Sequence, residues 1–204
     1  MVWNNGSPSL VLTPNHQPVD EVTAVSSDGA LIGGATILGQ DPLAPYGDGY
    51  LRRARGSTLA WVAPLPGDST PAQPLAISRH GEVVTGFSGN AFLSFNPGPF
   101  IWTRELGTAN LDDFLRGQGM AMEQYASLWS PVAVSDDGKI IAGWGLGFQY
   151  YAGWVVRVDT VVVCHRDDDT PKPGHKAEAH TLRVDFPREF DAHLAHGDTV
   201  GRCP

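Results

Sequence analysis

The chain has few charged residues and very few cysteines. Asp, Glu, Lys and Arg together make up 18% of its 204 residues, and cysteine occurs only 2 times. With 14 basic against 22 acidic residues, the formal net charge is −8 at pH 7. Nucleic-acid binding requires clustered Lys and Arg that neutralise phosphates, so we expect no nucleic-acid partner. No apolar run reaches the roughly 18 residues of a membrane-spanning helix, so we also expect no membrane span.

Glycine and proline, in contrast, are abundant. The chain contains 24 glycines and 16 prolines, which together exceed their usual share of a globular protein. Hydrophobic residues make up 42% of the sequence, enough to fill a core. This composition favours an all-β protein with many turns over a helical one.

One short motif occurs three times, at residues 24–34, 76–86 and 133–143. Each copy reads Ala-[Val/Ile]-Ser-x-x-Gly-x-x-[Ile/Val]-x-Gly without gaps. The central glycine indicates a tight turn, because glycine takes a positive φ at no steric cost. The β-branched residues on either side predict two strands, and the last glycine predicts a bend or a close approach by a neighbour. Each copy therefore predicts a β-hairpin.

Apolar strands alternate with these hairpins, and we expect them to be centred on Trp3, Trp61, Trp102 and Trp154. The unit from one motif to the next is long enough for four short strands, as in a propeller blade. Because the tryptophans lie inside apolar strands, we interpret them as core between sheets rather than as a platform for sugars.

The alternation of residues 100–103, Phe-Ile-Trp-Thr, with the three hairpins resembles the HAF-type repeat of bacterial exported proteins and autotransporter passenger regions. The resemblance covers about residues 1–158. It implies a β-propeller-like array outside the cytoplasm and no known catalytic activity.

Three repeats are fewer than the four to eight blades of a usual propeller. An open array exposes edge strands that pair with other chains, so we expect possible self-association through sheet edges. The alternatives are a longer parent chain, or closure by three large blades in which the Trp3 and Trp154 strands share one blade. The predicted fold class is thus all-β, a propeller-like array of about three repeats of antiparallel sheets.

The composition changes after Val158, and we expect a second, small module at residues 159–204. Five of the 7 histidines and both cysteines lie in this module, on either side of an acidic, proline-rich turn at residues 167–174. The segment resembles a short Cys/His-rich module at the C-terminus of many bacterial secreted proteins, for which the resemblance implies no secure activity.

Two interpretations of this module are open, and they are compatible. In the first, Cys164 and Cys203 form a disulfide, whose loop closure stabilises the small module by about 4 kcal/mol. In the second, the module holds a transition metal ion, zinc or copper. A site ligated by the cysteines is disfavoured, because neighbouring Cys164 and His165 rarely reach one ion. The candidate metal ligands are His165, His180, His193, His196 and Asp198.

Two further segments give local predictions. The basic stretch at residues 52–55 predicts a solvated loop, with an anion contact as the alternative. Residues 111–125 predict a short helix with Asn110 as its N-cap and acidic residues in its first turn. We interpret Asp112 and Asp113 as the start of this helix rather than as a catalytic pair.

The motifs are architectural and favour a secreted, non-catalytic binding or structural module that contacts a protein or glycan ligand through surface loops. The alternatives are a self-assembling extracellular filament or surface-layer subunit, and a propeller hydrolase acting on extracellular polysaccharide. No nucleophile elbow, P-loop or HExxH motif occurs. The first residues show no export signal, so we expect either a cytosolic protein or a sequence given without its leader. The low lysine content and the pair of cysteines favour the second alternative, with an extracellular or cell-surface location.

Overall fold

The computed structural model of the chain describes eleven ranges of residues: 2–4, 7–9, 21–35, 49–54, 56, 58–68, 72–89, 98–120, 127–146, 150–166 and 179–204. Strands dominate these ranges, and the two helices are short. Among the described residues, no helix combines the length and the apolar character needed to cross a membrane.

All three sequence motifs form antiparallel hairpins, as predicted. The hairpin strands are β3 (Glu21–Val25) with β4 (Leu31–Ala35), β7 (Ala72–Ile77) with β8 (Val84–Ser88), and β11 (Ser127–Val134) with β12 (Ile140–Leu146).

Each hairpin extends into a sheet in which neighbouring strands follow one another in the sequence. Sheet 1 has the order β3-β4-β5-β6, sheet 2 the order β7-β8-β9-β10, and sheet 3 the order β11-β12-β13. The added strands are β5 (Gly49–Arg53), β6 (Thr58–Val62), β9 (Gly98–Thr103), β10 (Gly107–Asn110) and β13 (Tyr151–Arg157). Sheets 1 and 2 therefore contain the four short strands expected of one repeat, whereas sheet 3 contains three among the described residues.

The serine of each motif ties its turn together. In the first turn the backbone N–H of Leu31 donates to Ser26 Oγ at 2.9 Å, and Ser26 Oγ donates to Asp28 Oδ1 at 2.8 Å. The third turn repeats both bonds, and the second repeats the bond to the serine. The turn glycines Gly29, Gly81 and Gly138 have φ of 69°, 74° and 76°. The positive φ explains the glycine of the motif, and the hydrogen bonds explain its serine, whereas the residues between them vary.

The predicted series of equivalent tryptophan strands is wrong. Trp154 lies on β13, the third strand of its sheet, opposite the last motif glycine, Gly143. The residues that occupy this position in sheets 1 and 2 are Tyr50 and Phe100. Trp61 instead lies on the fourth strand of sheet 1 and is 46% exposed. The repeated feature is an aromatic ring opposite a glycine, and its identity changes from Tyr to Phe to Trp.

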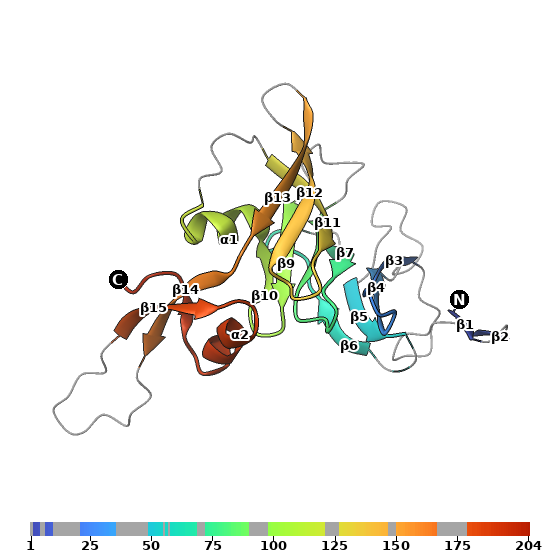
Figure 1. Ribbon diagram of the computed structural model, residues 1–204, viewed down its shortest axis with the longest axis horizontal. Coiled ribbons are helices and arrows are strands. Elements are labelled where there is room, and N and C mark those ends of the chain that lie inside the picture. The colour runs from blue at the N-terminus through green and yellow to red at the C-terminus, as the bar shows by residue number, and fades with distance from the viewer. Residues whose placement is uncertain are drawn as a thin grey trace.

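The three sheets stack in the order of the sequence (Figure 1). One cluster of buried residues joins sheet 1 to sheet 2 and includes Leu31, Leu51, Val84 and Phe100. A second, larger cluster joins sheet 2 to sheet 3 and continues into the C-terminal segment. The stack leads from sheet 1, near the N-terminus, to sheet 3 and the C-terminal segment on the other side of the molecule (Figure 1).

The structure shows no closed propeller among the described ranges. β1 (Val2–Asn4), which contains Trp3, pairs with β2 (Ser7–Ser9) in a separate two-stranded sheet. β13 ends its own sheet, next to β12. The strands of Trp3 and Trp154 thus do not share a blade, and the expected route to closure is not formed.

The C-terminal segment forms a sheet of its own with the order β15-β14-β16, and α2 packs against it. These elements are β14 (Thr160–Arg166), β15 (Ala179–Asp185), α2 (Arg188–Ala195) and β16 (Thr199–Val200). Its Val161, Phe186 and Phe190 lie in the same buried cluster as Ile141 and Trp154 of sheet 3. One hydrophobic core therefore crosses the expected boundary at residue 158, and independent folding of 1–158 and 159–204 stays a prediction. The proline-rich turn at 167–174 lies outside the described residues.

The helix predicted after Asn110 is present as α1 (Leu111–Gly117). The Asn110 side chain accepts a hydrogen bond from the backbone N–H of Asp113 at 3.1 Å, so it is the N-cap. The solvated loop predicted at 52–55 is wrong for Arg52, which lies on β5 and is only 7% exposed. Arg52 donates to backbone carbonyls of Arg53 and Gly56, which compensates the burial of its charge. Arg55 lies outside the described residues.

Candidate functional site

The predicted disulfide between Cys164 and Cys203 is present, with a Cα–Cα distance of 4.8 Å. Cys164 lies on β14, the central strand of the C-terminal sheet, and is buried. Cys203 lies beyond β16, and its backbone N–H donates to Thr181 Oγ1 on β15 at 3.1 Å. The bond therefore fastens the last residues of the chain to the middle of this sheet. Both cysteines are used in it, so neither is available as a thiolate ligand.

Three of the predicted metal ligands meet beside this disulfide-linked strand. His165 follows Cys164 on β14, His193 lies in the last turn of α2, and Asp198 precedes β16. One oxygen of Asp198 lies 2.8 Å from Nδ1 of His165 and 2.6 Å from Nδ1 of His193. The other oxygen accepts the backbone N–H of Arg166 at 3.0 Å. We call this group the His–Asp–His cluster.

Asp198 is the centre of the cluster and only 6% exposed. Burial acts to raise its pKa, but the hydrogen bonds from His165, from the backbone N–H of Arg166 and from His193 lower the pKa to about 2. The carboxylate is therefore ionised at neutral pH and held as an acceptor by three donors. The two imidazole rings lie edge to face, with centroids 5.3 Å apart.

The ligand atoms of His165, His193 and Asp198 lie within 4.8 Å of one another, so the cluster could hold a metal ion. Zn²⁺ with bonds of about 2.0–2.1 Å places neighbouring tetrahedral ligand atoms roughly 3.3 Å apart. The observed nitrogen-to-oxygen distances of 2.6 and 2.8 Å are shorter and match hydrogen bonds. The geometry shown is thus that of a hydrogen-bonded cluster, which has to open by about half an ångström to admit an ion.

The other two predicted ligands are not part of this group. His180 lies on β15, directly opposite His165 in the strand register, and is exposed. His196 is the C-cap of α2 and is also exposed. His193 and His196 are three positions apart, but α2 ends between them, at Ala195. The structure therefore selects His165, His193 and Asp198 from the five candidates.

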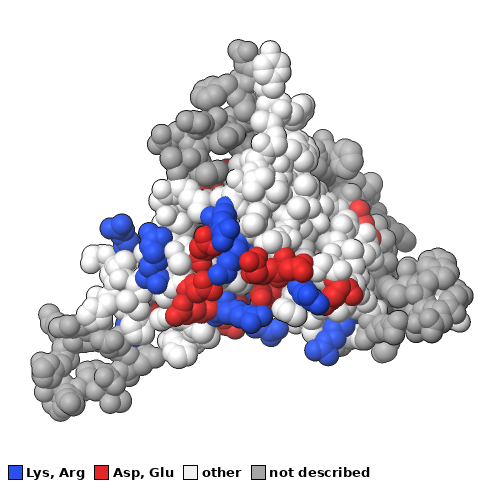
Figure 2. Space-filling model, in the orientation of Figure 1, with Lys and Arg blue, Asp and Glu red and all other residues white. Residues whose placement is uncertain are grey.

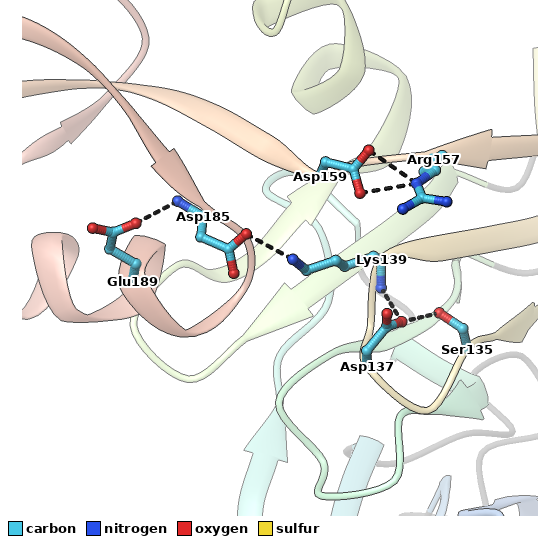
Figure 3. A network of polar contacts seen from close by, with 7 residues as sticks. All are labelled: Ser135, Asp137, Lys139, Arg157, Asp159, Asp185 and Glu189. Atoms are coloured by element: carbon cyan, nitrogen blue, oxygen red, sulfur yellow. Dashed lines mark hydrogen bonds and ion pairs between the residues drawn. The ribbon is translucent and has the colours of Figure 1, made fainter.

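A charged depression of about 360 Å³ lies where the second and third turns meet the C-terminal segment. Its lining carries both acidic and basic side chains, and Figure 2 shows a band of mixed acidic and basic side chains across one face of the molecule. The charges are paired with one another: Lys139 Nζ lies 2.6 Å from Asp185, and Arg188 Nε lies 2.5 Å from Glu82. Figure 3 shows how Lys139 links the third turn to Asp185, whose backbone N–H donates to Glu189. We interpret the depression as an interface whose ion pairs hold the C-terminal segment onto the second and third turns.

Sheet 3 also carries an exposed aromatic group that the sequence did not predict. Trp129, Trp144 and Tyr151 contact one another edge to face, with centroid distances of 5.7–6.0 Å. Trp144 is 42% and Tyr151 72% exposed, and Val155 beside them is 72% exposed. In Figure 2 the region over the upper parts of β12 and β13 carries no charged side chain. The only signal in the sequence was the local density of aromatic residues near the third motif.

Comparisons of the chain with protein-family models, with curated proteins and with solved structures gave no match. Interpretation of the site therefore depends on the chain's own residues.

Proposed function

We propose that the chain is a non-catalytic module that acts by contact, with the stack of three sheets as a rigid scaffold and the outer face of sheet 3 as its contact surface. We define this outer face by Ile140, Trp144, Tyr151 and Val155. The observation that carries the proposal is their exposure, from 38% for Ile140 to 72% for Tyr151 and Val155. Contiguous apolar surface of this kind is costly to leave in water and usually marks an interaction site.

The disulfide supports a location outside the cytoplasm for this module. Disulfides persist in oxidising compartments and are rare where thiols are kept reduced. A fastened C-terminus also suits a protein that keeps its shape without chaperones, because the cross-link restricts the unfolded chain. We therefore propose an extracellular or cell-surface module, in agreement with the expectation from the sequence.

The contact surface is tested by binding of matched tryptophan variants to solid probes. Trp144 on the outer face is 42% exposed, and Trp61 on sheet 1 is 46% exposed, so W61S is a control for loss of an exposed indole. The probes are insoluble cellulose, insoluble chitin and the immobilised protein itself. We expect retention of the wild type and of W61S on at least one probe, and at least tenfold weaker retention of W144S. Equal retention of W144S and W61S on every probe, or no retention of the wild type on any, contradicts the proposal.

A second candidate function is metal binding by the His–Asp–His cluster. Its support is the convergence of two imidazoles on a buried, ionised carboxylate. The nitrogen and oxygen ligands suit zinc or copper, and a site with three protein ligands leaves one position open. In this proposal the ion replaces the hydrogen bonds of Asp198 to the two histidines and holds the C-terminal segment together. Loss of the ion then loosens the packing of α2 on β14.

A further inference from the structure

Each sheet of the stack has two faces that the motif defines. We call the face with the last glycine of the motif the trailing face. The residue three positions before that glycine points to the opposite side, which we call the leading face. Leu31 and Leu51 on the leading face of sheet 1 share one buried cluster with Val84 and Phe100 on the trailing face of sheet 2. Sheets 2 and 3 are joined in the same way by the larger cluster.

The first strand of the following sheet makes this contact. β7 packs against β3, β4 and β5, and β11 packs against β7, β8 and β9. On β7 the contact residues are Pro74 and Ile77, which lie on the trailing face because they pair with Gly86 and Val84. A Cβ on Gly33 of β4 would lie 3.1 Å from both Pro74 Cβ and Ile77 Cδ1. The first strand of sheet 2 is thus pressed directly onto the leading face of sheet 1.

The turn glycines repeat the same contact. A Cβ on Gly81 would lie 2.8 Å from Leu31 Cδ1, and a Cβ on Gly138 would lie 2.7 Å from Val83 Cγ2. Leu31 and Val83 occupy the same position of the motif, so the second and third turns both lie on the leading face of the previous sheet. The stacking of a first hairpin on the previous sheet is therefore a property of the repeat.

Sheet 1 leaves the contact residues of its own first strand exposed. Val22 and Val25 of β3 occupy the places of the two contact residues of β7. They are 46% and 61% exposed, whereas Pro74 is buried and Ile77 is 5% exposed. In the first turn, a Cβ on Gly29 would meet no described atom within 4 Å. The first hairpin is thus open where the second and third hairpins lie on a sheet.

The rest of the trailing face of sheet 1 is different. In its middle, Ile32 on β4 and Tyr50 on β5 are 6% and 1% exposed. Trp61 is 46% exposed but lies on β6, at the opposite edge of the sheet from β3. Three strand spacings of about 4.8 Å separate the two edges, so a contact through β3 leaves Trp61 outside.

Sheet 3, at the other end of the stack, exposes the leading-face positions that sheets 1 and 2 bury. The motif residue of this face is at most 6% exposed in the first two sheets, whereas its equivalent Ile140 is 38% exposed. The residue on the third strand is at most 3% exposed in the first two sheets, whereas its equivalent Val155 is 72% exposed. The buried equivalents are Leu31, Val83, Leu51 and Ile101.

We propose that β3 of a second copy of the chain packs on the outer face of sheet 3, in the way that β7 packs on sheet 1 and β11 on sheet 2. The two ends of the stack expose one trailing and one leading face, which are the two halves of an interface that the chain forms twice. Neither internal interface joins two leading faces, so the observed packing favours this contact over sheet 3 on sheet 3. This inference depends on the proposed function of the outer face as a contact surface.

The contact links different copies, because sheet 2 separates sheet 1 from sheet 3 within one chain (Figure 1). It is a head-to-tail contact, so each copy binds one neighbour at each end and assemblies grow with concentration. One strand on one sheet face buries less than about 1,200 Å² in total, which is typical of weak contacts. We therefore expect reversible oligomers rather than a permanent complex.

Sedimentation equilibrium of the intact, disulfide-bonded protein tests the contact, at an ionic strength of about 0.15 M that screens the net charge of −8. We expect the wild type to form a series of oligomers that grows with concentration. V25D and V155D each disable one end and are expected to self-associate at least tenfold more weakly. An equimolar mixture of the two is expected to form a dimer with wild-type affinity, because sheet 3 of V25D binds β3 of V155D.

W61S is the matched control, because it removes an exposed side chain of sheet 1 that lies on β6. It is expected to associate like the wild type, and the dimer formed by the mixture shows that V25D and V155D are folded. A wild type that is monomeric at several hundred micromolar, or a mixture that associates no better than its components, overturns the proposal. Wild-type association of V25D, or loss in W61S equal to that in V25D, also overturns it.

Cross-linking with a short bis-maleimide locates the contact. Neither native cysteine is free, so an introduced cysteine is the single reactive thiol. Ile77 and Leu51, the internal equivalents of Val25 and Val155, lie in one buried cluster. We therefore expect a mixture of V25C and V155C to give a cross-linked dimer, and neither variant alone to do so. Self-cross-linking of V155C would show two copies of sheet 3 in contact and overturn the proposal.

The head-to-tail contact and the proposed function fail in different ways. If the wild type stays monomeric but is retained on cellulose or chitin in a manner that depends on Trp144, the face remains a contact surface and the second copy is excluded as its occupant. If neither association nor retention occurs, both proposals are wrong. For retention on the protein itself, the immobilised copy is V155D, so that only its β3 is available to sheet 3 of the mobile copy.

Discussion

Gly143 and Trp154 face one another across β12 and β13, and a Cβ on Gly143 would lie 2.5 Å from Cζ2 of the indole. The same Cβ would lie 2.2 Å from the backbone oxygen of Ser130 on β11. The last glycine of the motif is thus required by crowding from two sides. Gly34 and Gly86 are crowded in the same way, each by a backbone oxygen at 2.0 Å and by the aromatic ring opposite.

The first prediction concerns this crowding. G143A is expected to lower the free energy of unfolding by about 3 kcal/mol, because a paired backbone cannot move aside as a flexible side chain can. G153A is the control on the neighbouring strand, where the nearest atom to a Cβ lies at 3.8 Å. We expect its effect to stay below about 0.5 kcal/mol. Urea titration followed by circular dichroism measures both, and similar values for the two variants would contradict the crowding.

The motif could be predicted from the sequence because its requirements are local. The bonds of Ser26 and Ser135 join residues a few positions apart, and the turn glycines need a positive φ wherever they occur. The aromatic residue across from the last glycine could not be predicted, because its place in the sequence and its identity are not fixed by the motif. The connections from β4 to β5, β8 to β9 and β12 to β13 differ in length, and the residue changes among Tyr50, Phe100 and Trp154.

In the C-terminal segment, too, the sequence predicted only what does not depend on the fold. With only two cysteines, Cys164 could be paired with Cys203 from composition alone. The choice of His193 over His196 could not be made, because it depends on where α2 ends and on how Asp198 returns toward β14. The exposure of the outer face of sheet 3 was also hidden, since equivalent residues in the other two sheets are buried.

The second prediction concerns the disulfide. Its 39-residue separation predicts that C164A/C203A lowers the free energy of unfolding by about 4 kcal/mol through the entropy of the unfolded chain. T181V is the control, because it removes the hydrogen bond of the Cys203 N–H but keeps the disulfide. We expect T181V to cost about 1 kcal/mol. Chemical denaturation measures both, and an unchanged midpoint for C164A/C203A would contradict the stabilising role.

The third prediction concerns the His–Asp–His cluster. If it binds zinc, isothermal titration of the metal-free protein gives one site per chain, and H193A weakens it by roughly 100-fold or more. H196A is a matched control, because His196 is three residues away and outside the cluster. It is expected to bind zinc like the wild type. Equal affinity in H193A and H196A would show that the cluster is only hydrogen-bonded.

The fourth prediction concerns the turn carboxylate Asp137. Hydrogen bonds from Ser135 Oγ and the backbone N–H of Lys139 lower its pKa below the ordinary value of 3.8. A carboxyl whose pKa is lower in the folded than in the unfolded protein stabilises above the unfolded pKa and loses this effect as the pH falls through the folded pKa. Because Asp137 is exposed and solvent screens its charge, D137A should lower the free energy of unfolding at pH 7 by only a few tenths of a kcal/mol, with a difference from wild type that shrinks below about pH 4.

The control for this prediction is H80A, at the same position in the second turn, where Ser78 still accepts the backbone N–H of Val83. H80A should leave stability nearly unchanged at pH 7. Thermal melts from pH 7 to pH 3 measure both variants, and a constant difference between wild type and D137A over this range would contradict the assignment.

The most direct measurement of the central claim is hydroxyl-radical footprinting of the wild type, free and retained on the solid probe that binds it, read residue by residue by mass spectrometry. If the outer face of sheet 3 is the contact surface, oxidation of Trp144 and Tyr151 falls severalfold in the retained protein, while oxidation of Trp61 stays the same. Equal oxidation of all three residues in the free and the retained protein would contradict the account.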